Sequence, residues 1–300
     1  MELADIIIKK IEEEDTSKAS TNILICFSKK ITGKALGELT QMMLRFNSGK
    51  SSITMLNLIN KEQAENIEDK NIYKSELYSD INISRETDKL TVRTFVKESE
   101  NFAQEIIHTA EEQKANIVLF GIGHNLFSSD IWVKYLKLRS ESTVLGEEEY
   151  KRELGEKATY TLRNITTILK RQEYTSGILV TNRYRGEFNN IFIPILREND
   201  AYALPFLYQL GKNQNVTITV WDAIGFIESN PKLQKLFNSI SRRADGKIGI
   251  WRNDRKIEDE FIQQMDLMII GSEGWSRLIV TPLSWINHLP SVLIINDKID

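Results

Sequence analysis

The sequence predicts an α/β fold built from two doubly wound parallel sheets that follow one another along the chain. Its apolar stretches are short and continuous rather than alternating, which is typical of strands covered by helices on both faces. A strand followed by a helix-like run occurs at 23–46 and again at 191–210. Each half also contains a later apolar strand that ends on glycine, at 115–123 and at 265–274. The repeated order indicates a duplicated α/β unit, in which either copy could have kept a ligand site.

The first half is expected to contain strands and helices in alternation. The strands are expected at 22–28, 51–59, 89–96, 115–121 and 176–182. The helices are expected at 33–47, 97–114 and 147–173. In the last of these, a stripe at helical spacing would cover the first sheet; it consists of Tyr150, Leu154, Ala158, Leu162, Ile165 and Leu169. The polar segment 60–88 is interpreted as a surface loop or a flap.

The second half repeats this order in a more compact form. Its strands are expected at 190–196, 216–221, 246–251, 265–271 and 291–296. Its helices are expected at 199–212, 231–243 and 256–264, with a short one at 277–287.

Three segments follow from this organisation. Residues 1–20 have no strong core pattern and are expected to be a tether or a fraying helix. Residues 21–184 are expected to form the first domain and residues 185–300 the second. A length of 300 residues suits two domains of ordinary size. The linker around 183–190 is short, which favours packing of the two sheets against each other.

Composition excludes several classes of protein. The formal net charge of −3 argues against a broad nucleic-acid surface, which needs a basic stripe. The single cysteine, Cys26, cannot form an internal disulfide, which fits a reducing compartment, and its apolar strand predicts an inert core residue. No run approaches the ~20 apolar residues that span a bilayer, and the N-terminus does not read as a signal peptide.

Patterns for catalysis or metal binding are scarce. The three histidines, His108, His124 and His288, are far apart and form no HExxH motif. The sequence has neither a GxxxxGK[ST] loop nor a GxSxG elbow. We therefore expect no catalytic residues, no metal site and no enzymatic activity.

The glycines that follow the fourth strand of each half are the better candidates for a ligand site. Ligands of open parallel sheets bind beyond the carboxyl ends of the strands, where glycine lets the backbone approach a phosphate. In the second half, Gly271, Gly274 and Ser276 form such a turn; in the first half, Gly121 and Gly123 precede His124. The alternative is that glycine only ends a strand tightly and that His124 is a surface residue.

The order of elements and these glycines resemble the universal stress protein family, with two copies in tandem (the adenine nucleotide alpha hydrolase-like fold). Nucleotide-binding members have an aspartate at the end of the first strand and a Gly-x-x-Gly, nine residues, Gly-Ser/Thr loop after the fourth. Here Gly271 and Gly274 match the first part of that loop, but Ser284-Trp285 stands where glycine and a hydroxyl residue are expected. The first strands end in Phe27-Ser28 and Leu196-Arg197, without aspartate. Both copies depart from the pattern, which argues against binding an adenine nucleotide in the usual way. At the end of the second-half loop, Ser284 remains as a candidate ligand-binding residue.

A narrower resemblance is to the cytoplasmic C-terminal region of monovalent cation/proton antiporters. It rests on 162–180, on 192–204 with its Arg197-Glu198-Asn199-Asp200, and on 266–285. The resemblance implies a non-catalytic regulatory domain on the cytoplasmic face of an inner (plasma) membrane protein of the Na⁺ or K⁺/proton antiporter class. Such a domain could sense a ligand in the cleft near Gly271. Its partner would be a membrane transporter domain, expected in the same polypeptide, and residues 1–20 would lead from the last membrane helix.

Two further expectations follow from the universal stress protein resemblance. Its members often pair through the last strand of the sheet, so 176–182 and 291–296 are expected to meet within this chain; a homodimer is a further state that the family allows.

The alternative function is a free-standing tandem universal stress protein that binds an adenine nucleotide. An α/β hydrolase or nucleotidyl-transfer enzyme ranks last, because no catalytic set is assembled.

Overall fold

The structure is a computed structural model of the 300-residue chain. It describes residues 2–16, 20–44, 49–81, 83, 90–123, 156–169, 171, 173–213, 215–251, 256–279, 281 and 283–296. The predicted residues His124, Tyr150 and Leu154 lie outside these ranges.

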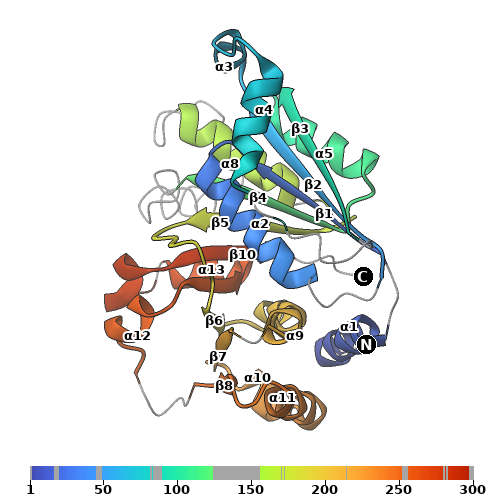
Figure 1. The fold of residues 1–300 in the computed structure, drawn as a ribbon. Coiled ribbons are helices and arrows are strands. Elements are labelled where there is room, and N and C mark those ends of the chain that lie inside the picture. The colour runs from blue at the N-terminus through green and yellow to red at the C-terminus, as the bar shows by residue number, and fades with distance from the viewer. Residues whose placement is uncertain are drawn as a thin grey trace.

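A single sheet of ten strands forms the centre of the molecule (Figure 1). In chain order the strands are β1 (Thr21–Phe27), β2 (Ser51–Ile59), β3 (Leu90–Glu98), β4 (Ile117–Gly123), β5 (Thr175–Thr181), β6 (Asn190–Ile195), β7 (Thr217–Asp222), β8 (Ile248–Ile250), β9 (Leu267–Gly271) and β10 (Ser291–Asn296). Their order across the sheet is β3-β2-β1-β4-β5-β10-β9-β6-β7-β8. Every pair is parallel except β5 with β10. The predicted α/β class with a mostly parallel sheet is confirmed, but the two separate sheets that the sequence predicts are one continuous sheet.

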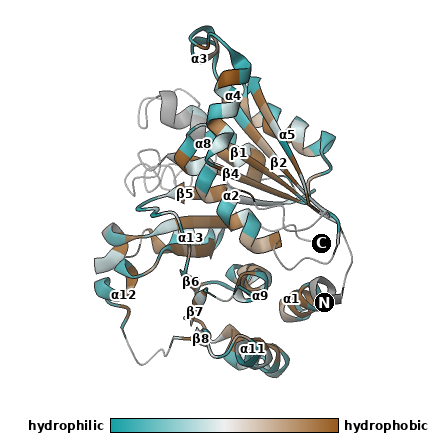
Figure 2. Ribbon diagram, viewed as in Figure 1, coloured by the Kyte–Doolittle hydropathy of each residue, from teal (hydrophilic) through white to brown (hydrophobic). Residues whose placement is uncertain are grey.

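Helices cover the sheet on both faces. The first-half helices are α1 (Leu3–Thr16), α2 (Lys30–Leu44), α3 (Lys61–Glu65), α4 (Lys70–Ser79), α5 (Phe102–Glu112) and α8 (Glu156–Leu169). The second-half helices are η2 (Glu198–Ala203), α9 (Leu204–Gly211), α10 (Phe226–Ser229), α11 (Pro231–Arg243), α12 (Asp259–Gln263), α13 (Ser272–Leu278) and η3 (Ser284–His288). Figure 2 shows hydrophobic strands between helices whose outer sides are hydrophilic.

Two hydrophobic cores lie on opposite faces of the sheet, because successive strand residues point to opposite sides. Ile23 and Ile25 of β1 belong to the core that packs under α1, α2, α4, α9 and α11. Leu24 and Cys26 belong to the core under α5, α8, α12 and α13. Burial raises the pKa of the Cys26 thiol, which agrees with an inert core residue.

The strand order of the first five strands is mirrored by the last five. β5 and β10 meet at the centre as an antiparallel pair, so the predicted contact between 176–182 and 291–296 is confirmed. Within this pair Ile178 and Ile294 lie opposite each other. The two isoleucines occupy equivalent positions in their strands. Thr175 of β5 pairs with the first residue of β4, Ile117, and Ser291 of β10 pairs with the first residue of β9, Leu267. Ile178 and Ile294 each lie three residues after these paired positions.

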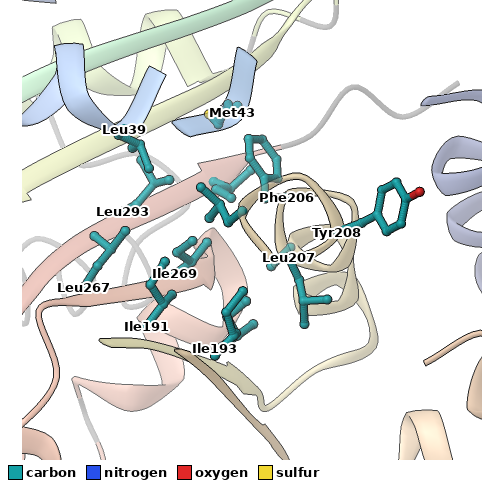
Figure 3. Packing of buried hydrophobic residues seen from close by; sticks show 14 of the residues in the cluster. Leu39, Met43, Ile191, Ile193, Phe206, Leu207, Tyr208, Leu267, Ile269 and Leu293 are labelled. Atoms are coloured by element: carbon teal, nitrogen blue, oxygen red, sulfur yellow. The ribbon is translucent and has the colours of Figure 1, made fainter. Parts of the chain in front are cut away.

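The two halves also contact each other above one face of the sheet. Figure 3 shows Leu39 and Met43 of α2 near Phe206 of α9 and Leu293 of β10. The Asn213 side-chain amide donates to the Met42 carbonyl at 3.1 Å. Helices from the two halves therefore share one core instead of two separate ones.

The segment between the halves is held at both of its ends by carboxylates. Glu38 of α2 accepts from the Tyr184 hydroxyl at 2.5 Å and from the Phe188 N–H at 2.8 Å. Burial raises the pKa of Glu38, and the bonds from Tyr184 and Phe188 oppose this rise. At the other end, Asp266 accepts from the backbone N–H groups of Asn189 and Asn190 at 3.1 and 2.8 Å. This linker is thus fixed against both halves.

Several elements differ from the sequence-based expectation. Segment 60–88 contains the helices α3 and α4, whose N-caps are Asn60 and Asp69. The helix expected at 277–287 is instead two short helices, α13, which starts directly after β9, and η3. Of the helix expected at 147–173, the part 156–169 is observed as α8, and 147–155 lies outside the described residues.

The N-terminal segment is a packed helix. Ala4, Ile7 and Ile11 of α1 are buried in the same core as α9 and α11. Lys232 of α11 also forms an ion pair with Asp5 at 3.1 Å. The helix therefore docks on the second half, although it precedes the first half in sequence (Figure 1). The tether role of 1–20 and the domain bounds 21–184 and 185–300 stay predictions.

Replacing Ile294 by alanine is expected to lower the free energy of unfolding by about 2–5 kcal/mol, because a cavity would form at the β5–β10 junction. Ile294 is 1% exposed, whereas Ile72 on α4 is 58% exposed. The matched Ile72→Ala variant should change the free energy by less than about 0.5 kcal/mol. Urea unfolding of the three proteins measures this, and equal losses in both variants would contradict the packing described for the junction.

Candidate functional site

The predicted anion-binding turn of the second half is occupied by a side chain of the same protein. Gly271 ends β9, and Gly274 lies in the first turn of α13. Against both glycines lies Asp200 of η2, which is 0% exposed. The sequence predicts either an anion-binding turn or a tight strand end at this position, and the structure places a carboxylate there.

Asp200 binds backbone groups from two segments that are far apart in the sequence. Its Oδ2 accepts from the N–H groups of Leu196 at 2.9 Å and Arg197 at 2.8 Å, at the end of β6. Its Oδ1 accepts from the N–H group of Gly274 at 3.0 Å. An N-cap side chain would normally accept from this N–H group, but Gly271 is the N-cap residue and has no side chain to do so. Asp200 thus provides the cap from a distant segment.

Glycine is required at both positions because Asp200 leaves no space for a Cβ atom. A Cβ added to Gly271 would lie 3.1 Å from the Asp200 Cα atom and would overlap Oδ1. A Cβ added to Gly274 would lie 2.5 Å from the Asp200 Cγ atom and would overlap both carboxylate oxygens. The two glycines are therefore explained by the approach of an internal carboxylate. The sequence predicts that the backbone approaches the phosphate of a ligand here, whereas in the structure it approaches the carboxylate of Asp200.

Burial and hydrogen bonding act on the pKa of Asp200 in opposite directions. Burial disfavours the charged form and is the larger effect, and it raises the pKa to about 6 from the ordinary value of 3.8. The three N–H groups that donate to the carboxylate lower the pKa, and the nearby charge of Glu273 raises it. Asp200 therefore titrates closer to neutrality than an ordinary aspartate.

The first half fills the corresponding space with a threonine. Ile23 pairs with Ile117 and Ile191 pairs with Leu267, which aligns the two halves strand by strand. On this alignment Gly121 matches Gly271, and Thr32 matches Asp200. A Cβ on Gly121 would overlap the methyl group of Thr32, which is 2% exposed, and the Thr32 and Thr181 hydroxyls lie 3.3 Å apart. Both glycine positions are thus covered from within the chain.

Of the remaining predicted residues, those that the structure describes do not join this site. The Ser276 hydroxyl donates to the Ser272 carbonyl of its own helix at 2.9 Å. Ser284 begins η3 and donates to Asp259, which also contacts His288 at 3.5 Å. Gly123 is the last residue of β4. His124 lies outside the described residues, so its predicted role is untested.

A polar hollow of about 600 Å³ lies elsewhere, at the amino ends of β1, β2 and β3. Its lining includes Asn22, Ser52, Arg93 and Lys114. It lies at the opposite edge of the first-half strands from the predicted glycines. Its residues come from separate strands and form no sequence motif, so the sequence gives no signal for it.

No group of His, Cys, Asp and Glu side chains that could hold a metal ion occurs among the residues that the structure describes. Within the same ranges, no helix is long and apolar enough to cross a bilayer. In comparisons with known proteins, no family model matches the sequence and no curated protein matches it significantly.

Substituting Gly274 by alanine is expected to lower the free energy of unfolding by about 1–3 kcal/mol, because the new methyl group overlaps the buried Asp200 carboxylate. The matched Gly249→Ala variant in β8, where no heavy atom lies within 4 Å of the added Cβ, should change it by less than about 0.5 kcal/mol. Thermal or urea unfolding measures both. A Gly274→Ala protein as stable as Gly249→Ala would show that the turn is not closed by Asp200.

Proposed function

We propose that this chain is a cytoplasmic regulatory domain of a monovalent cation (Na⁺ or K⁺)/proton antiporter, built from two universal stress protein-like units and without catalytic activity. The observation that carries the proposal is the position of Asp200, which fills the glycine turn that a nucleotide phosphate would need. Antiporter identity rests on the sequence resemblance at 162–180, 192–204 and 266–285.

The tandem arrangement is supported by the geometry of the sheet. The strand order 3-2-1-4-5 of the first half recurs in reverse in the second, and β5 pairs antiparallel with β10. Equivalent residues Ile178 and Ile294 face each other, as expected at a two-fold axis between duplicated units. Thr32 and Asp200 occupy equivalent positions next to equivalent glycines. Two adenine nucleotide alpha hydrolase-like units in tandem would give this pattern.

Electrostatics argue against the alternative of a free-standing nucleotide-binding protein. A phosphate at the second-half turn would meet the ionised Asp200 carboxylate. Two like charges 4 Å apart repel by about 4 kcal/mol at an effective dielectric of 20. A phosphate could enter only by displacing Asp200 and taking over its N–H donors, and in the first half Thr32 covers Gly121. We therefore propose that neither unit binds adenine nucleotide in the usual way.

A domain of this kind would act by favouring one state of the transporter through contacts that differ between the states. Helix α1 is the natural connection to the membrane part, because it precedes the first half and packs on α9, α11 and η2 of the second. A movement of the membrane part would therefore reach the second half directly. The membrane transporter domain, in the same polypeptide, is the proposed partner, and the cytoplasmic face of the inner membrane is the proposed location.

The proposal predicts a continuous reading frame upstream of the Met1 codon that encodes several apolar segments of ~20 residues. It also predicts that the full-length protein catalyses cation/proton exchange in inverted membrane vesicles. Removing residues 2–300 should leave exchange in place but change its dependence on cation concentration or pH.

Two outcomes would contradict this assignment. One is a stop codon in frame immediately upstream, with the chain expressed by itself. The other is a full-length transporter whose exchange is identical with and without residues 2–300, with insertion into the membrane confirmed by immunoblot for both proteins.

A further inference from the structure

Asp200 is the buried link between the end of β6 and α13, which are also joined by hydrogen bonds from Asn199 to Glu273 at 3.2 Å and from Arg277 to the Leu196 carbonyl at 3.0 Å. Its Oδ2 receives both N–H groups from its own side, those of Leu196 and Arg197, while its Oδ1 receives the single N–H group of Gly274 across the site. An ionised carboxylate accepts strongly at both oxygens, whereas in a protonated carboxyl group the oxygen that carries the proton becomes a donor and only a weak acceptor. The oxygen with one N–H partner is the less costly place for the proton. Protonation would therefore act first on the bond to Gly274.

We propose that the Asp200–Gly274 contact is a proton-sensitive connection, in which uptake of a proton by Asp200 weakens the attachment of α13 to η2 and loosens α1, which docks on η2. The ionised form holds the connection closed by a charge-assisted hydrogen bond. The pKa of Asp200, raised by burial to about 6, puts this change within a physiological range of pH.

Helices α1, α9 and α13 and strands β6 and β9 pack against η2, and of these only α1 and α13 carry charged residues. Helix α13 contributes Glu273, which raises the pKa of Asp200, and Arg277, whose guanidinium donates to the Leu196 carbonyl at 3.0 Å. The η2 turn itself carries Arg197 and Glu198. The strands β6 and β9 and helix α9 contain no charged residue.

Helix α1 contacts η2 next to Asp200. The Lys10 ammonium lies 5.3 Å from the centre of the Tyr202 ring, and Tyr202 and Ala201 belong to the same core as Ile7 and Ile11. The other charges of α1 whose side chains are described include Asp5, which pairs with Lys232 of α11. A change in the position of η2 would therefore be transmitted to α1 through packed side chains.

This inference rests on the proposed function only for its biological role, since it would supply an antiporter domain with a measure of cytoplasmic pH. The contact itself can be tested on the isolated chain. Failure of the antiporter assignment would appear in the reading frame and in transport, and failure of this inference would appear in the titration below.

The test is NMR of the wild-type protein labelled uniformly with ¹³C and ¹⁵N, over pH 4.5–8. Through-bond correlations from the backbone amide through the Cβ atom to the carboxyl carbon assign the Asp200 carboxyl signal in the wild-type protein itself. We expect that signal to titrate with a midpoint near 6 and the protection factor of the Gly274 amide, corrected for the intrinsic exchange rate, to fall about tenfold below the midpoint. Peptides from α1 should lose protection over the same range.

Asp222→Asn is the matched control. Asp222 is also 0% exposed and also accepts from three backbone N–H groups, but all three belong to the nearby residues Phe226, Ile227 and Glu228. The control should keep the pH dependence of Gly274, whereas Asp200→Asn should show low protection at every pH. An Asp200 midpoint below 4.5, or Gly274 and α1 protection that does not follow the Asp200 titration in the wild-type protein, would overturn the inference even if the Asp200→Asn variant does not fold.

Discussion

The antiparallel pairing of β5 with β10 is the constraint on which the rest of the structure depends. Each half supplies five parallel strands, and a parallel sheet of this kind leaves its last strand as an open edge. Joining the two last strands removes both edges, and β3 and β8 are the end strands of the sheet that the structure describes. The pairing also brings α2 and α9 into one core above the junction.

The same pairing sets where a ligand could bind. Because β5 and β10 run in opposite directions, the carboxyl ends of the strands lie on opposite edges of the sheet in the two halves. The glycines at Gly121 and Gly271 therefore belong to two separate positions. Each position is filled locally, by Thr32 in one half and Asp200 in the other. In both halves the backbone makes the close approach that glycine allows, and a side chain of the same half occupies the space.

Most of the fold could be predicted from the sequence, since all ten strands were expected within a few residues of where they lie. The strands are continuous apolar runs bounded by polar segments, which is a local signal. A helix in residues 1–20 was one of the two expected alternatives, but its packing on the second half was not expected, because only Ala4, Ile7 and Ile11 mark its buried side among many charges. In segment 60–88 the N-caps Asn60 and Asp69 were a readable signal for α3 and α4. The content of the glycine turn could not be predicted, because Asp200 and Gly274 are 74 residues apart.

Calorimetric titration of the folded chain with ATP, AMP and cyclic dinucleotides tests most directly whether the glycine turns are closed from within. We predict no saturable heat with any of them at pH 7.5, where Asp200 is ionised. Saturable binding that persists in the Gly249→Ala protein and disappears in a folded Gly274→Ala protein would contradict this account. It would mean that a phosphate displaces Asp200 and that the second half is a nucleotide-binding unit.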